Sequence, residues 1–355
     1  MARAKRRERW WAWAVAALVL GVAGTAGAAE TALTAGQCLS CHANPITGTL
    51  ASGEVLSLQV KPQELARSVH GGKLGCTDCH RDIRQMPHAR RAFPDRRAYT
   101  LGLYEACKGC HFAEYTKTLD SVHFAQQARG DPRAPVCVDC HGAHNVSRPN
   151  RPRQHISQTC ARCHQGIFEA YRASVHGKAL VEEGNGDVPT CTDCHRSHNV
   201  EDPRTAGFKL RTPELCATCH RDKGRMAKYG LSTGVFDTYV RDFHGMTARL
   251  QREGKADPSA FTAVCTDCHG VHDIRPAKDP ASSVMRANLA ATCRRCHPGA
   301  TENFPAAWLS HYEPSWRRTP LVYTVKVLYW IFIPFTIGGL LAHIGLDLWR
   351  VATNR

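Results

Sequence analysis

The sequence contains no cysteine outside a single recurring motif. Its eighteen cysteines form nine consecutive pairs, and every pair has the form Cys-x-x-Cys-His. Histidine makes up only 20 of the 355 residues, so its occurrence directly after all nine cysteine pairs is not due to chance. The absence of leftover cysteines excludes a disulfide-stapled scaffold and a cytosolic enzyme with a few free thiols. The paired cysteines are Cys38, Cys41, Cys76, Cys79, Cys107, Cys110, Cys137, Cys140, Cys160, Cys163, Cys191, Cys194, Cys216, Cys219, Cys265, Cys268, Cys293 and Cys296.

A long amphipathic helical period is also absent, while Pro, Gly, Asp and Asn are scattered throughout the chain. Both features predict that loops dominate. Residues 30–320 number 291, about 32 per motif, which is too little chain for an apolar core around each one. The sequence therefore predicts a mostly α fold with extensive irregular loops and almost no sheet. Short helices should carry the motifs, with a few longer helices such as Pro213–Tyr229.

Each Cys-x-x-Cys-His segment is the attachment site of one c-type haem. The cysteines form thioether bonds to the haem vinyl groups, and the adjacent histidine binds the iron as the proximal ligand. Nine haems would then form most of the core. Nine Cys-Cys-His zinc sites would need nine further ligands and a reducing compartment, so haem is preferred. The proximal histidines are His42, His80, His111, His141, His164, His195, His220, His269 and His297.

The basic character of the chain does not indicate a nucleic-acid partner. The formal net charge is +15, and without the basic N-terminal segment the excess is about +11. Nine haems would carry eighteen propionates, with which the basic side chains are expected to pair. No nucleic-acid binding is therefore predicted, although basic chains are often interpreted that way.

Residues 1–29 have the features of a secretory signal peptide. The basic stretch MARAKRRER precedes an apolar run, Trp10–Ala29, that ends in small residues. The alternative is an uncleaved anchor helix, because the run is about long enough to cross a bilayer. In either case the chain from Cys38 onward is expected in the bacterial periplasm.

A second apolar run lies near the C-terminus. Val327–Leu346 is twenty residues without a formal charge, apart from the ionisable His343, and predicts one transmembrane helix. Arg350 and Arg355 follow the run and favour a cytoplasmic C-terminus. Residues 321–355 are therefore expected to anchor a periplasmic haem domain, residues 30–320, in the inner membrane.

The histidines outside the motifs reveal four copies of an internal repeat. One copy consists of an early histidine, which stands in Ser-Val-His in the first three copies, a first motif followed by another histidine, and a second motif. The lone motif Cys38–His42 precedes the first copy, and His311 follows the last. Asp precedes the second cysteine in the four first motifs only, which predicts two alternating classes of haem site. Two histidines per copy plus His311 give the candidate distal iron ligands: His70, His88, His123, His144, His176, His198, His244, His272 and His311.

Nine candidate distal ligands match nine haems. His144, His198 and His272 lie three residues after a proximal histidine, too close to reach the opposite face of the same haem, so each should ligate a neighbouring haem. His88 follows its proximal histidine by eight residues, and His155 has no counterpart in the other copies. Which of these two is a ligand stays open. The methionines follow no repeat and are interpreted as packing residues.

Bis-histidine ligation leaves no iron position for a substrate, so the sequence favours an electron carrier without catalytic residues. No motif replaces its histidine with lysine, the change that marks the catalytic haem of some multihaem nitrite reductases. The alternative is a reductase or oxidase of small nitrogen or sulfur oxyanions with one five-coordinate haem. The irregular His88 site and Cys38–His42 are the places where that could occur. A subunit whose haems only connect parts of a larger complex is a further alternative.

Residues 36–312 resemble the multihaem c-type cytochromes of anaerobic and metal-respiring bacteria with paired Cys-x-x-Cys-His motifs. Residues 318–323 and 340–350 are similar to the first helix of a b-type dihaem membrane cytochrome. In quinol-oxidising inner-membrane cytochromes, such a domain is joined to a nine-haem c-type domain. The resemblance implies that His343 binds haem b, with the second axial ligand supplied by a separate membrane subunit.

The sequence as a whole predicts a membrane-anchored periplasmic nonahaem cytochrome of anaerobic respiration. It would carry electrons from the quinol pool, or from a b-type membrane partner, to periplasmic acceptors.

Overall fold

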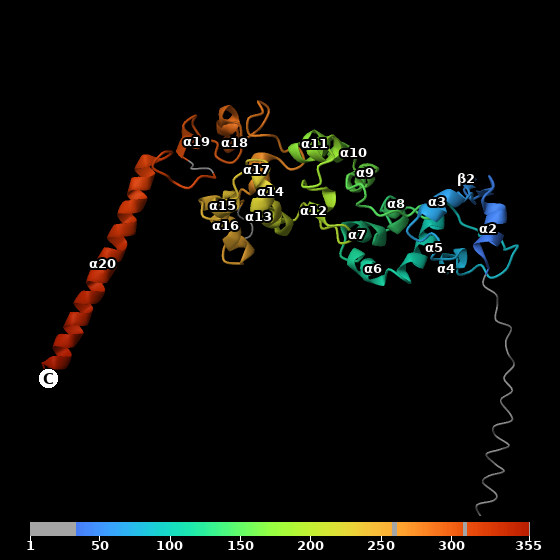
Figure 1. The fold of residues 1–355 in the computed structure, drawn as a ribbon, viewed down its shortest axis with the longest axis horizontal. Coiled ribbons are helices and arrows are strands. Elements are labelled where there is room, and N and C mark those ends of the chain that lie inside the picture. The colour runs from blue at the N-terminus through green and yellow to red at the C-terminus, as the bar shows by residue number, and fades with distance from the viewer. Residues whose placement is uncertain (1–32, 258–260, 308–310, 355) are drawn as a thin grey trace, which may run out of the picture. The chain divides into compact units, whose positions relative to one another are not determined.

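The computed structural model describes residues 33–257, 261–307 and 311–354. Within these residues short helices are joined by irregular loops, and the sheet consists of two strands (Figure 1). The predicted fold class, mostly α with extensive loops and almost no sheet, is therefore confirmed. The predicted signal peptide, residues 1–29, lies outside the described residues.

The chain forms two compact units, and the first comprises residues 1–110 and 142–147. In the two-stranded antiparallel sheet, Thr47 lies opposite Ser57. The elements of this unit are α2 (Ala35–His42), β1 (Thr47–Thr49), β2 (Val55–Ser57), α3 (Pro62–Arg67), α4 (Cys76–Cys79) and α5 (Arg96–Lys108).

The second unit comprises residues 111–141 and 148–355. Its elements are α6 (Phe112–Thr118), α7 (Val122–Ala128), α8 (Cys137–His141), α9 (His155–Ala161), α10 (Gln165–Ala173), α11 (Val175–Val181), α12 (Cys191–His195), α13 (Ala206–His220), α14 (Lys223–Ala227), α15 (Val235–Tyr239), α16 (Phe243–Arg252), α17 (Cys265–His269), η1 (Arg286–Asn288), α18 (Leu289–Arg294), α19 (Phe304–Ala307) and α20 (Pro320–Thr353).

Four motifs begin a short helix at their first cysteine, and these are the four motifs with Asp before the second cysteine. In each, an Asp Oδ2 accepts a hydrogen bond from the backbone N–H of the residue before the first cysteine. The capping carboxylate satisfies a donor that a helix start leaves free. The four bonds run from Gly75 to Asp78 (2.7 Å), Val136 to Asp139 (2.7 Å), Thr190 to Asp193 (2.6 Å) and Val264 to Asp267 (2.8 Å).

The other five motifs lie at the C-terminal ends of helices that begin earlier in the chain. In these motifs the first cysteine lies inside or at the end of an existing helix, so no cap is needed at the cysteine. The aspartate difference seen in the sequence therefore corresponds to two local structures. The helices that lead into these motifs are α2, α5, α9, α13 and α18.

The predicted helix Pro213–Tyr229 is wrong at both ends. Helix α13 begins at Ala206, where Thr205 caps the N–H of Phe208, and Pro213 lies in its interior. Proline cannot donate to the carbonyl one turn earlier. The hydroxyl of Thr212 donates to the Lys209 carbonyl instead, at 2.8 Å, so the helix continues to the end of its motif.

His176 and His244 lie in the first turns of α11 and α16, where the chain passes so close to the preceding helix that only glycine fits at the next position. A Cβ atom at Gly177 would lie 1.9 Å from the Tyr171 carbonyl oxygen, and one at Gly245 would lie 2.0 Å from that of Tyr239. These glycines follow His176 and His244 directly. The close approach lets each helix start turn back against the preceding helix, and this sets the position of its histidine.

Two tyrosines connect these turns to the next motif. The Tyr171 hydroxyl donates to the Pro189 carbonyl at 2.6 Å, and the Tyr239 hydroxyl donates to the Ala263 carbonyl at 3.0 Å. Each acceptor lies two residues before the first cysteine of a motif. The third and fourth copies thus share one packing arrangement.

Few large apolar side chains are deeply buried in the described residues. Leu180 and Val264 are 1% and 2% exposed, and much of the remaining buried apolar set is alanine or single aromatic residues. Such a small apolar core agrees with the expectation that bound groups contribute most of the interior.

Helix α20 is different in character from the rest of the chain. It has 34 residues and is long and apolar enough to cross a membrane. It contains the predicted span, Val327–Leu346, and His343 lies within it. Figure 1 shows it as one continuous helix.

Candidate haem-binding sites

Imidazole rings face each other in pairs in both units, and each pair joins a motif histidine to a predicted distal histidine. In the first unit the pairs are His42 with His88 and His80 with His144, both with ring centroids 6.1 Å apart. In the second unit the pairs and centroid distances are His164–His123 (6.2 Å), His141–His198 (6.1 Å), His220–His176 (6.3 Å), His195–His272 (6.0 Å), His297–His244 (6.2 Å) and His269–His311 (6.1 Å).

The spacing of these rings fits one metal atom between them. A metal–imidazole nitrogen bond is about 2 Å and the ring centroid lies roughly 1.1 Å beyond the nitrogen, which places two opposed centroids about 6.2 Å apart. The angle between the ring planes ranges from 4° to 60° across the eight pairs. Rings in direct contact would change their separation with tilt, whereas here the separation is nearly constant. The pairs therefore fit axial ligands on opposite faces of one haem iron.

Two rules describe the pairing in the second unit. A second motif faces the early histidine of its own copy, as His220 faces His176. A first motif faces the histidine that follows the first motif of the next copy, as His195 faces His272. His311 faces the last first-motif histidine, His269, and so stands where a further copy would continue the pattern.

A backbone hydrogen bond accompanies each connection between copies. The N–H of Val122 donates to the Val200 carbonyl at 2.8 Å, and the N–H of Val175 donates to the Ile274 carbonyl at 2.9 Å. In the first unit, Val69 donates to Val146 at 2.8 Å. Each donor precedes a candidate distal histidine, and each acceptor lies two residues after another one. The copies are thus joined in register.

The structure separates His88 from His155. His88 faces His42 with nearly parallel rings, at 4°. His155 is exposed at the first position of α9, and no ring pair among the described residues includes it. In the described residues, His88 and not His155 thus lies opposite a motif histidine.

The remaining candidates are His70 and the proximal His111, which belong to different units. Both take part in interactions. Eight pairs thus leave one motif histidine and one candidate distal histidine, as the sequence count requires.

All eighteen cysteines are free of disulfide bonds. The first-cysteine thiols of successive motifs lie close enough to interact, Cys38 with Cys76, Cys160 with Cys191 and Cys216 with Cys265. The first-cysteine edges of these motif pairs therefore meet within each unit, which suits attachment of neighbouring haems.

Burial keeps several of the paired imidazoles neutral. Burial lowers the pKa of His176 to about 4, and burial together with the Arg91 guanidinium lowers the pKa of His80 to about 4. A neutral imidazole offers a lone pair, which is the form that binds a metal.

The outward-facing nitrogens of four of these histidines have different partners. His42 Nδ1 lies 2.9 Å from the Leu58 carbonyl oxygen, and His88 Nδ1 lies 3.0 Å from that of Ala89. His80 Nδ1 lies 3.2 Å from Arg91 Nη1. His198 Nδ1 lies 2.7 Å from Glu114 Oε2. Such contacts orient a ligand imidazole and change its basicity. Sequence analysis missed Arg91 and Glu114, because neither occupies a repeated position.

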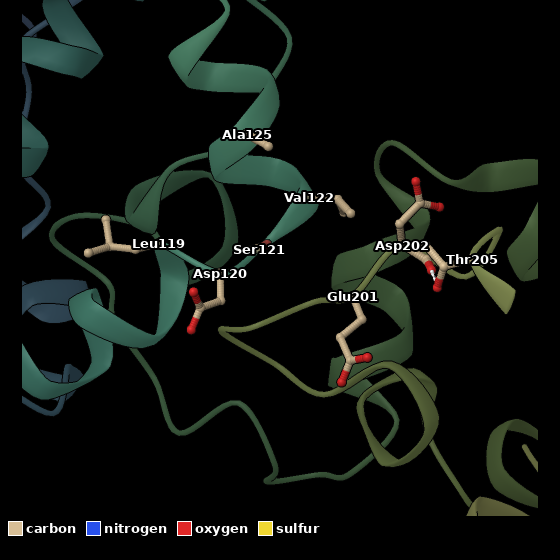
Figure 2. Close-up of a pocket in the computed structure, with 8 residues that line it drawn as sticks. All are labelled: Leu119, Asp120, Ser121, Val122, Ala125, Glu201, Asp202 and Thr205. Atoms are coloured by element: carbon tan, nitrogen blue, oxygen red, sulfur yellow. Dashed lines mark hydrogen bonds between the residues drawn. The ribbon is translucent and has the colours of Figure 1, made fainter. Parts of the chain in front are cut away.

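An open hollow of about 350 Å³ lies beside one connection between copies in the second unit (Figure 2). Figure 2 shows Val122 at its wall, opposite Glu201 and Asp202. Arg211 pairs with Glu201, and Arg204 pairs with Asp202 at 2.9 Å, so two of its carboxylates are already neutralised. The hollow lies at a junction between copies. It is lined by Leu119, Asp120, Ser121, Val122, Ala125, Glu201, Asp202 and Thr205.

The described residues contain no group of three or more His, Cys, Asp or Glu side chains arranged to hold a free metal ion. The histidines instead occur two by two beside Cys-x-x-Cys segments. This arrangement suits haem, in which the porphyrin supplies the other iron ligands, better than zinc.

The comparisons with known proteins agree with this chemistry. No solved structure matches the chain. Residues 132–221 match the family model described as cytochrome c3, and this segment contains four of the motifs. The match, together with the cysteine pairs and facing imidazoles, supports a multihaem c-type cytochrome that binds its haems covalently and transfers electrons.

Proposed function

We propose that the protein is a membrane-anchored periplasmic nonahaem cytochrome. In this proposal it carries electrons from the quinol pool, or from a b-type membrane partner, to periplasmic acceptors. The observation that carries the proposal is the set of eight imidazole pairs with centroids 6.0–6.3 Å apart. A ninth haem follows from the count of motifs, because Cys107, Cys110 and His111 form the remaining motif.

The residues of the chain have separate tasks in this function. Bound haems supply one-electron oxidation and reduction. The cysteines would attach each haem, and the two histidines of each pair would bind its iron and keep a substrate away from it. Pairs such as His195–His272 also join neighbouring copies, which keeps successive sites close.

The geometry favours the carrier over the enzyme alternative. An enzyme would need one iron with an open position, and the irregular His88 site and Cys38–His42 are its best candidates. The ring centroids of His42 and His88 lie 6.1 Å apart, so each of these two irregular sites has a second histidine close to it.

The membrane part of the proposal rests on α20. An apolar helix of this length fits an anchor, and an ionisable residue within a span is a functional-site hypothesis by default. We therefore propose that His343 binds a haem b shared with a separate membrane subunit. The quinol would be oxidised in that subunit and not in the periplasmic part of the chain.

The test is reduction of the full-length protein in native membranes by a quinol analogue, compared with reduction by dithionite. His343→Ala should lose most of the quinol-driven reduction while dithionite still reduces every haem. His155→Ala is the matched control, because His155 is exposed and outside the ring pairs, and it should behave like the unchanged protein. Unchanged quinol-driven reduction in His343→Ala would contradict the proposed route of electron entry.

A further inference from the structure

The imidazole pair His141–His198 has a carboxylate beside one of its rings. His198 Nδ1 lies 2.7 Å from Glu114 Oε2, within hydrogen-bonding distance. At His42 and His88 the corresponding partners are neutral backbone carbonyls. The negative charge of a carboxylate makes this contact chemically distinct.

Glu114 is held in place by a second partner. Lys117, one turn later in α6, donates from Nζ to Glu114 Oε1 at 2.8 Å, which leaves Oε2 for His198. The two carboxylate oxygens of Glu114 thus contact different partners, Lys117 and His198.

The position of Glu114 in the repeat is not used this way elsewhere. Glu114 lies three residues after a second-motif histidine, and the matching positions in the other copies are Ile167, Lys223 and Ala300. Only the first copy therefore offers a carboxylate at this place. The feature belongs to one site and not to the repeat as such.

We propose that Glu114 is a positioning residue that lowers the reduction potential of the haem bound between His141 and His198. The inference rests on the proposed function, because it requires a haem at this pair. An imidazole that donates Nδ1–H to a carboxylate is a more basic ligand. A more basic ligand and a nearby negative charge both favour ferric over ferrous iron, because the ferric form carries one more positive charge. Lys117 opposes part of this effect.

The experiment is a spectroscopic redox titration of the full-length haem-loaded protein, with haem content and low-spin EPR intensity measured on the same samples. Glu114→Gln keeps a hydrogen-bond acceptor but removes the charge, and it should move one midpoint upward. Lys117→Met removes the opposing ammonium and should move the same midpoint downward. Glu169→Gln is the control, because Glu169 pairs with Arg172 at 3.0 Å on α10 and should move no midpoint.

His198→Met identifies which midpoint belongs to this site, because methionine ligation raises the potential of a haem. The expected result is that all three changes act on one midpoint while haem content and low-spin intensity stay at the wild-type level in the Glu114 and Lys117 variants. If His198→Met moves a midpoint but Glu114→Gln and Lys117→Met do not, the role of Glu114 is overturned and the ligand assignment stands. If His198→Met changes no midpoint and no EPR signal, the ligand pairing itself is wrong.

Discussion

The two kinds of motif obtain their facing histidines in different ways. Motifs that begin a capped helix face a histidine from the next copy, as His195 faces His272. Second motifs, which end a helix that begins earlier in the chain, face a histidine from their own copy in the described pairs, as His220 faces His176. The lone motif also ends a helix, α2, but it faces His88 of the first copy. The first kind joins copies and the second kind closes each copy on itself. Histidine pairs of the first kind thus connect copies of a chain whose described residues have a small apolar core.

Removal of one facing histidine of each kind tests this difference most strongly. His272→Ala and His176→Ala should each leave one haem per chain high-spin, because each frees one axial position. His272→Ala should also lower the unfolding midpoint more, since it breaks a connection between two copies. Quantitative EPR and thermal unfolding measure the two effects. Equal losses of stability would mean that the copies are joined by backbone contacts alone.

The turn before His176 offers the next largest effect. Gly177→Ala should destabilise the protein by about 1–3 kcal/mol, because a Cβ atom there would meet the Tyr171 carbonyl and force the helix start to move. Denaturant unfolding measures the change, and the EPR signal should show a weakened second-motif site.

Gly166→Ala in α10 is the matched control for that substitution. Nothing lies within 4 Å of a Cβ atom at Gly166. This change should be neutral or stabilise the protein by up to about 1 kcal/mol, as expected for alanine in a helix. Similar destabilisation by both substitutions would argue against a special turn at Gly177.

The aspartate caps should give the smallest effect. Asp267→Ala should cost about 1 kcal/mol, because the Val264 N–H loses its acceptor at the start of α17. The matched position in the motif of α13 is Thr218, inside a continuous helix, and Thr218→Ala should change the free energy of unfolding by less. If both changes cost the same, the cap does not distinguish the two kinds of motif.

Much of the candidate site could be predicted from the sequence because haem attachment uses a short local motif. The nine motifs, the two classes marked by Asp, and the inference that His144, His198 and His272 serve a neighbouring site all follow from spacing. The structure brings each of these three histidines to a motif histidine of the preceding copy.

Other features depend on contacts that spacing does not reveal. Pro213 indicated a helix start, but Thr205 caps the helix earlier and Thr212 satisfies the carbonyl that proline leaves free. Glu114 and His198 are 84 positions apart, and their contact depends on how two copies pack. Sequence spacing does not show which of His88 and His155 lies near a motif histidine, because the position of the His88 ring opposite His42 depends on how the loops fold.

The measurement that tests the central claim most directly is EPR of the air-oxidised, detergent-solubilised full-length protein, quantified against its haem content. The account predicts nine haems per chain, all ferric and low-spin, because it assigns two histidine ligands to every haem. A high-spin signal equal to about one haem per chain would contradict it. That result would show an open iron position and restore the enzyme alternative.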